Sequence, residues 1–310
     1  MPQALMLQAS SFPERDIWRT TFGWEGDSPF KDQRVRQAVS MMIDREAYID
    51  ALDNRAGFRK DGLELPVKYG TAIGAGWNGY YIDPTDAKAF GDTGKYLKFN
   101  LAEAKKLVQA AGHANGFEFN LYWNNAGNFP IYNRIVGVYN AMFIDGGLKP
   151  KLVGMNTQQL MADYTDVHAS AGFKDGTKKG FSGMLMRTDR PFGSPVLGMY
   201  GQLNKNGAYY QGVSPTGNRV QDGDPKVNEL TDKLRGEFDL QKQQALVQEL
   251  VKYVTGQSYV IPQVSQAKAY SLWWPAVRNV GVFDSSPNES LWKESRLDWW
   301  IDATKAPLTR

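Results

Sequence analysis

The sequence contains no cysteine and only two histidines, and it has no long apolar run. Without cysteine, the chain forms no disulfides and no thiolate metal sites. His113 and His168 stand far apart, which makes them a poor pair of metal ligands. No segment reaches the roughly 20 apolar residues that a transmembrane helix needs. The net charge of +3 over 310 residues is too small to indicate a nucleic-acid or membrane-surface partner.

Catalytic motifs are also missing. The string Gly180-Phe181-Ser182-Gly183 lacks the spacing of a nucleophile elbow, and residues 91–95 lack that of a phosphate-binding loop. Residues 222–224 have no glutamate placed to close a calcium loop, so we interpret them as a turn with Asp224 as a helix N-cap. Carboxylates are numerous, so a glycan-acting hydrolase with an unassigned carboxylate pair stays open. We expect no metal and no cofactor.

Two helix starts lie between residues 29 and 52. Asp32 and Asp44 are placed as N-caps, because their carboxylates can accept hydrogen bonds from the first turn of a following helix. Beyond Asp32, apolar residues recur at helical spacing, at Val35, Val39, Met42 and Ile43. These patterns predict two short amphipathic helices in succession.

Elsewhere, strand and helix patterns alternate along the chain. Strands are predicted at 5–7, 17–24, 117–121, 149–153 and 181–186, and helices at 100–111, 130–143, 225–237 and 240–254. Asn100 with Glu103, and Asn156 with Gln159, are placed as capping boxes. Residues 201–224 are predicted to be a long surface loop. The alternation favours an α/β lobe built in layers.

Three segments together resemble a known family. They are residues 29–47, residues 100–119, and residues 224–262. In this order they are similar to landmarks of the extracellular solute-binding proteins of the oligopeptide, dipeptide and nickel class, family 5. These proteins are the capture subunits of ABC importers, and the resemblance covers roughly residues 20–285.

The resemblance implies a periplasmic-binding-protein-like lobe, with helices layered on a mixed sheet. It divides the chain into hinge-side strands at 1–28, a second α/β lobe at 29–263, and a segment at 264–310 that returns toward a first lobe. Only 28 residues precede the first landmark, and they do not form a secretory signal. We therefore expect the C-terminal part of a longer extracytoplasmic protein, with a naturally short cytosolic homologue as the alternative.

The sharpest site prediction falls on residues 184–191. In the peptide binders that this segment resembles, a carboxylate four residues before a proline holds the α-amino group of the ligand. Here Arg187 takes that position, Asp189 is the nearest carboxylate, and Met184 replaces an aromatic residue. Arg187 favours an anionic group or sugar hydroxyls, because its guanidinium is a planar fork of donors. The alternative is a surface or salt-bridged arginine.

Aromatic residues supply further candidates for ligand contact. Trp24, Trp123 and Tyr210 stand at predicted strand ends or in loops, where cleft residues usually lie. Core or edge packing is the alternative for each of them. Trp299 and Trp300 are adjacent on a predicted strand, so they point to opposite faces and at least one should pack against the protein.

The function expected from the resemblance is non-enzymatic solute capture. The solute would be an oligopeptide or an oligosaccharide, held between two lobes that close by a hinge and delivered to ABC transporter permease subunits. The partners are then the solute, the permease and the missing N-terminal lobe, with no nucleic acid. The hydrolase alternative predicts turnover, and a third possibility is an interaction module for the missing lobe alone.

Overall fold

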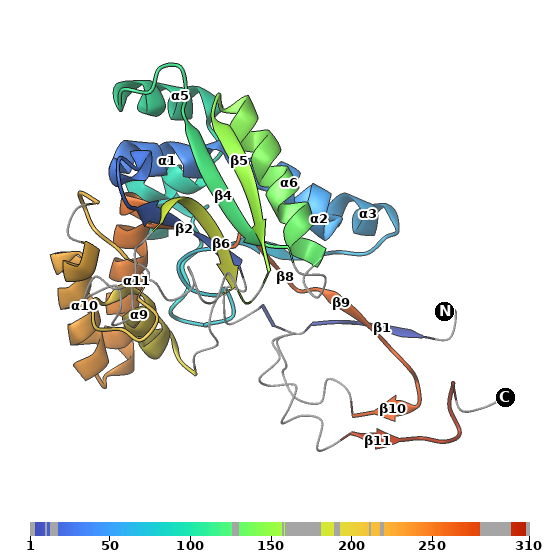
Figure 1. Cartoon of the computed structure of the whole chain (residues 1–310). Coiled ribbons are helices and arrows are strands. Elements are labelled where there is room, and N and C mark those ends of the chain that lie inside the picture. The colour runs from blue at the N-terminus through green and yellow to red at the C-terminus, as the bar shows by residue number, and fades with distance from the viewer. Residues whose placement is uncertain are drawn as a thin grey trace.

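The computed structural model describes residues 4–9, 11–12, 18–125, 130–156, 158, 181–188, 193–210, 212–217, 220–279 and 299–307. At its centre is a mixed sheet with the strand order β5-β4-β6-β2-β7 (Figure 1). The strands are β2 (Trp18–Trp24), β4 (Glu118–Asn124), β5 (Lys149–Met155), β6 (Ser182–Thr188) and β7 (Val260–Ile261). Strand β4 runs parallel to β5 and β6, whereas β2 runs antiparallel to β6 and β7. This confirms the predicted mixed sheet.

Strand β4 shows why the sheet has two different faces. Phe119 and Leu121 alternate along it and are buried in the main hydrophobic cluster. Tyr122 is also buried, because it packs with Phe181 and Leu185 in a second, smaller cluster. The sheet therefore buries apolar side chains on both faces.

The helix pair after β2 begins where the sequence predicts. After η1 (Pro29–Lys31), helix α1 (Gln33–Met42) starts at Asp32, whose Oδ1 accepts a 2.8 Å bond from the amide of Arg34. Helix α2 (Arg45–Asp53) starts at Asp44, whose Oδ1 accepts from the amide of Ala47 at 3.0 Å. Both N-caps are confirmed. The turn at Asn54 then leads into α3 (Arg55–Lys60).

Helix α5 (Leu101–Ala110) uses half of its predicted capping box. The side-chain oxygen of Asn100 accepts from the amide of Glu103 at 3.0 Å. The amide of Asn100, however, donates to the carbonyl of Met41 at 3.0 Å, so it needs no bond from the glutamate. This bond ties the start of α5 to the end of α1. Before α5 lie β3 (Val67–Tyr69), α4 (Ala87–Phe90) and η2 (Asp92–Leu97), and after β4 comes α6 (Pro130–Asp145).

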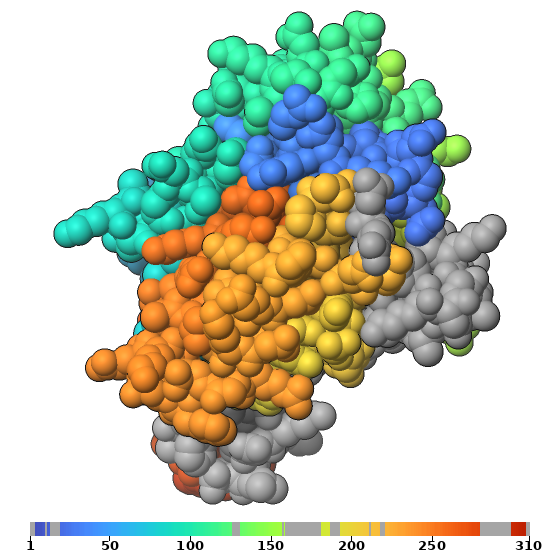
Figure 2. Space-filling view, turned by 90° about the vertical axis from the view of Figure 1, so that its left-hand side faces the viewer, coloured from blue at the N-terminus to red at the C-terminus, as the bar shows by residue number. Residues whose placement is uncertain are grey.

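A second group of helices packs below the sheet in Figure 1. It consists of α9 (Pro195–Leu203), η4 (Val220–Asp222), α10 (Pro225–Gly236) and α11 (Leu240–Gln257). In Figure 2 the orange segment, which contains α10 and α11, covers much of the lower part of the face shown. Asp224 caps α10, as predicted. The surface loop predicted for 201–224 is wrong, since Leu203, Tyr210 and Val213 are buried in the main cluster.

Short two-stranded ribbons lie beside the sheet. They pair β1 (Leu5–Gln8) with β9 (Tyr270–Trp273), β3 with β8 (Ser265–Ala267), and β10 (Val277–Arg278) with β11 (Trp300–Ile301). The ring of Trp299 packs edge-on against Trp273 at 5.1 Å, whereas 51% of Trp300 is exposed. The expectation that at least one of this tryptophan pair packs is therefore confirmed.

Two predictions involve residues that the structure does not describe. The capping box at Asn156 and Gln159 and the site candidate Asp189 involve residues outside the described ranges. Among the described residues, no helix is long and apolar enough to cross a membrane. No group of three or more potential metal ligands gathers among them either.

Candidate ligand-binding site

The strand directions single out one edge of the sheet. The carboxyl ends of β4, β5 and β6 meet there, together with the amino end of the antiparallel strand β2. In open α/β sheets, ligands bind outside the carboxyl ends of the strands, where successive loops diverge. We call this side the carboxyl edge. It contains two of the predicted site residues, Trp123 and Arg187.

Trp123 is held at the carboxyl edge from two sides. Its indole Nε1 donates a 2.8 Å hydrogen bond to Oδ1 of Asn133, on α6. On the neighbouring strand β5, residue 154 is a glycine, and a Cβ there would lie only 3.0 Å from Cζ2 of Trp123. The ring therefore lies against the backbone of Gly154, a contact that a larger residue would push away. Because Trp123 is only partly buried, it offers a fixed aromatic surface.

Arg187 lies near the end of β6, one residue before Thr188. Its backbone is paired directly with that of Arg19 on β2. Arg19 was not predicted as a site residue, because a single arginine within a strand pattern does not by itself indicate ligand binding. Arg19 is buried, with 4% of its surface exposed. The carboxyl edge therefore brings together two arginines that stand 168 positions apart in the sequence.

Trp24 lies at the opposite end of the sheet. It pairs with Ser182, at the start of β6, because β2 runs antiparallel to β6. Only 3% of Trp24 is exposed, and the guanidinium of Arg36 lies 5.1 Å from the centroid of its ring. The structure therefore separates Trp24 from Arg187 and gives it a packing role.

Met184 and Tyr210 are also buried. Met184 has no exposed surface and belongs to the main cluster, on the strand before Arg187. Tyr210 is 1% exposed, and its hydroxyl donates a 2.9 Å bond to the carbonyl of Val213. Burial raises the pKa of this hydroxyl. Because neither side chain reaches the surface, neither can touch a ligand in this arrangement, and we leave both out of the proposed site.

Sequence analysis missed a buried polar cluster around Arg36. Its guanidinium donates to the carbonyls of Phe30, Lys31 and Gln257 at 2.8, 3.0 and 3.1 Å. Burial lowers the pKa of Arg36 to about 10. The cluster joins the start of α1 to the end of α11, and it lies in the segment that carries the first family landmark.

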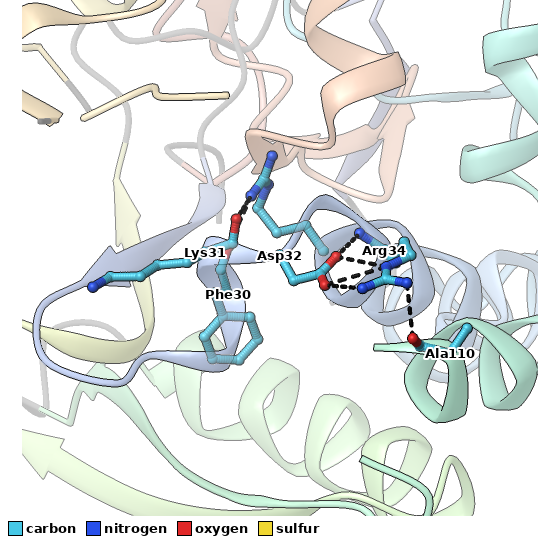
Figure 3. Close-up of polar contacts among 6 residues, drawn as sticks. Phe30, Lys31, Asp32, Arg34 and Ala110 are labelled. Atoms are coloured by element: carbon cyan, nitrogen blue, oxygen red, sulfur yellow. Dashed lines mark hydrogen bonds and ion pairs between the residues drawn. The ribbon is translucent and has the colours of Figure 1, made fainter. Parts of the chain in front are cut away.

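The same segment is stabilised at its surface by Asp32 and Arg34, whose side chains point toward one another in Figure 3. Nη2 of Arg34 lies 2.6 Å from Oδ2 of Asp32, and Nη1 of Arg34 donates to the carbonyl of Ala110 at 2.8 Å. The hydrogen bond from Arg34 lowers the pKa of the Asp32 carboxyl. One arginine thus links the cap of α1 to the end of α5.

Comparison with known proteins identifies the family. The family model for bacterial extracellular solute-binding proteins, family 5 (middle segment), matches residues 6–210. The chain belongs to this family. No curated protein sequence matches it.

Solved structures share the fold of this solute-binding protein at low sequence identity. The peptide-bound DppA of Helicobacter pylori is 16% identical, with a TM-score of 0.62, and the match covers 90% of this chain and 46% of DppA. The nonapeptide-bound AppA of Bacillus subtilis is 13% identical, with a TM-score of 0.62 and 96% and 52% covered. AgaA of A. tumefacien R10, bound to agropinic acid, is 21% identical, with a TM-score of 0.59 and 89% and 48% covered. The solute-binding protein thus spans about half the length of these structures.

Proposed function

We propose that this chain forms one lobe of an extracytoplasmic solute-binding protein that captures a small solute for an ABC importer. The carboxyl edge is this lobe's half of the ligand site, and the first, N-terminal lobe closes on the solute from the other side. The partners are then the solute, the permease subunits of the importer, and that first lobe. The observation that carries the proposal is the family match, combined with a fixed, partly exposed Trp123 at the carboxyl edge.

The exposed apolar side chains of the two-stranded ribbons support the presence of the first lobe. Large fractions of Leu5, Met6 and Leu272 are exposed on the β1–β9 ribbon, at 47%, 44% and 64%. On the β10–β11 ribbon, 61% of Ile301 is exposed. Two-stranded ribbons are marginally stable in water, so they need a covering surface. We infer that the first lobe covers these side chains and that the strands near both ends of the chain form the hinge side.

The relatives narrow the kind of solute. DppA and AppA hold peptides, whereas AgaA holds an acid, agropinic acid. Arg187 stands where the peptide binders are expected to place a carboxylate for the α-amino group. We propose that the solute places an anionic group or hydroxyls at Arg187. A peptide-like molecule with no free ammonium at this position, or an oligosaccharide, would fit this requirement.

Calorimetry on the two-lobed protein tests the function. We expect saturable binding of a compound from a peptide or oligosaccharide library, with no turnover of it. Trp123→Ala should weaken this binding about fivefold or more, since loss of an aromatic contact at a binding site costs more than about 1 kcal/mol. Phe238→Ala is the matched control, because Phe238 is 92% exposed in the turn between α10 and α11. Steady hydrolysis of the bound compound would contradict the proposal.

A further inference from the structure

Two asparagines flank Trp123 at the carboxyl edge. Asn133 of α6 accepts the 2.8 Å hydrogen bond from the indole Nε1. Asn125 follows β4, and its backbone amide donates to the carbonyl of Met155, at the end of β5, at 2.9 Å. A Cβ built on Gly154 would lie 2.6 Å from Nδ2 of Asn125 and 3.0 Å from Cζ2 of Trp123. The side-chain amide of Asn125 and the ring of Trp123 therefore lie over the same glycine.

These contacts fix one edge of the indole. Nε1 and Cζ2 stand on the same side of the ring system, so α6 and β5 hold that edge between them. Strands β4 and β5 and helix α6 are neighbours in the fold (Figure 1). Trp123 also packs against the main apolar cluster, yet part of its surface stays exposed. This exposed part is a rigid aromatic surface, so a ligand that binds there immobilises little of the protein.

Both asparagines keep hydrogen-bonding groups for a ligand. A side-chain amide has two N–H donors and one carbonyl acceptor, and both of these side chains are exposed. Within the described part of the chain, Trp123 engages Oδ1 of Asn133, whereas Nδ2 of Asn133 and the side-chain amide of Asn125 form no hydrogen bond. The next residue on α6, Arg134, is directed to α2, where its Nη2 donates to the carbonyl of Ala51 at 2.9 Å. The two side chains that flank the ring are thus neutral amides with free donors.

We propose that a pyranose ring of a neutral saccharide stacks on Trp123 and that Asn125 and Asn133 bond its hydroxyls. The C–H face of a pyranose is apolar and lies flat on an aromatic ring, while its equatorial hydroxyls point outward, toward groups at the rim of that ring. Each hydroxyl both donates and accepts, as an amide does, whereas the charged ends of a free peptide find no opposite charge in these amides. Of the solutes that fit at Arg187, the oligosaccharide is thereby selected. That the saccharide is an imported solute rests on the proposed function, whereas its stacking on Trp123 does not.

Nuclear magnetic resonance on this chain tests the saccharide site without any assumption about import. The probes are cellobiose, maltose and lactose, with N-acetyl-trialanine amide as the reference peptide, and the observed signal is the backbone amide of Gly154. We expect a saturable shift with at least one of the sugars and none with the peptide. Trp123→Ala should weaken sugar binding about fivefold or more, and Asn125→Ala about threefold or more. The matched control is Asn115→Ala, which should leave sugar binding unchanged, because Asn115 is exposed in the turn before β4, at the other edge of the sheet.

The outcomes separate this inference from the proposed function. The saccharide site is overturned if none of the three sugars gives a saturable shift, if the peptide shifts the signal as strongly as a sugar does, or if sugar binding is unchanged in either variant. Asn125→Ala decides alone if Trp123→Ala does not fold, since Asn125 is exposed. A two-lobed protein that binds a peptide, with no sugar site in this chain, would reject the saccharide and uphold solute capture. A sugar site in this chain, combined with a two-lobed protein that binds no solute, would uphold the site and reject the import function.

Discussion

The guanidinium of Arg36 lies 5.1 Å from the centre of the Trp24 ring and 5.3 Å from that of Tyr259. Arg36 has no exposed surface, and Trp24 is 3% exposed. A cation–π contact of this kind gains strength when it is desolvated. The three residues come from α1, the end of β2 and the segment after α11, so Arg36 fastens distant parts of the lobe to one another.

Substitution of Arg36 by lysine should destabilise the lobe. Lysine keeps the charge but cannot donate to the carbonyls of Phe30, Lys31 and Gln257 together, and it does not lie flat on Trp24. We expect the free energy of unfolding to fall by about 2–4 kcal/mol in urea titrations, from lost bonds to buried carbonyls. Arg59→Lys, on exposed α3, should change it by less than about 0.5 kcal/mol. An Arg36→Lys variant as stable as the parent would show that the guanidinium fork is dispensable.

Alkaline pH should destabilise the lobe through Tyr259. Burial, and the bond that its hydroxyl donates to Asp224, raise the pKa of Tyr259 far above the usual value. In the unfolded chain tyrosine ionises near pH 10, so above that pH the folded state binds more protons and stability falls as pH rises. In Tyr259→Phe, the midpoint of thermal unfolding should fall less steeply between about pH 10 and pH 12. The opposite contribution of Arg36, whose pKa burial lowers to about 10, is present in both proteins. If the unfolding midpoints of the parent protein and of Tyr259→Phe fall equally with pH, Tyr259 is not the cause of the alkaline destabilisation.

The isolated chain should associate with itself through the ribbons. Leu272 and Ile301 are 64% and 61% exposed, and patches of this kind promote association. Replacing both by lysine should shift the sedimentation coefficient toward that of a monomer. Leu240→Lys is the control, because Leu240 is 57% exposed but lies at the start of α11. A parent chain that stays monomeric at high concentration, with β1 and β9 protected from hydrogen exchange, would refute the prediction.

The two-lobed protein should discriminate against ligands that present a free amino terminus to Arg187. An ammonium would meet the positive charge of an arginine there, in place of a charged hydrogen bond that contributes about 1.5–3 kcal/mol. We expect N-acetylation of a peptide ligand to leave its affinity unchanged or to raise it. Arg187→Asp should reverse that preference. Peptide binding that N-acetylation abolishes in the parent protein would show that the Arg187 prediction is wrong and would point to Asp189.

Local chemistry made much of the fold predictable. Asp32, Asp44 and Asp224 each cap a helix where the sequence indicates, because a cap depends on residues within one turn. The role of Arg36 could not be read in this way, since its partner Gln257 stands 221 positions away. The burial of Tyr210 could not be read from the local pattern either, because Tyr210 belongs to a cluster that draws residues from Phe22 to Val264.

The place of the candidate site residues in the sheet was predicted only in part. Trp123 and Arg187 both lie at the carboxyl edge, as strand-end candidates should. Trp24 is also at a strand end, but at the other side of the sheet. Which end it occupies depends on the antiparallel pairing of β2 with β6, a contact between segments more than 150 residues apart that periodicity cannot reveal.

The place of β2 in the sheet bears on how the protein is made. Strand β2 lies between β6 and β7, yet it is translated long before either of them. Ribosomes add about 5–20 residues per second, so on the order of ten seconds or more separates the synthesis of β2 from that of β6. During that interval Phe22 and its neighbours have no partner strand and expose their apolar side chains. The strand order implies that the sheet closes only after nearly the whole lobe has left the ribosome.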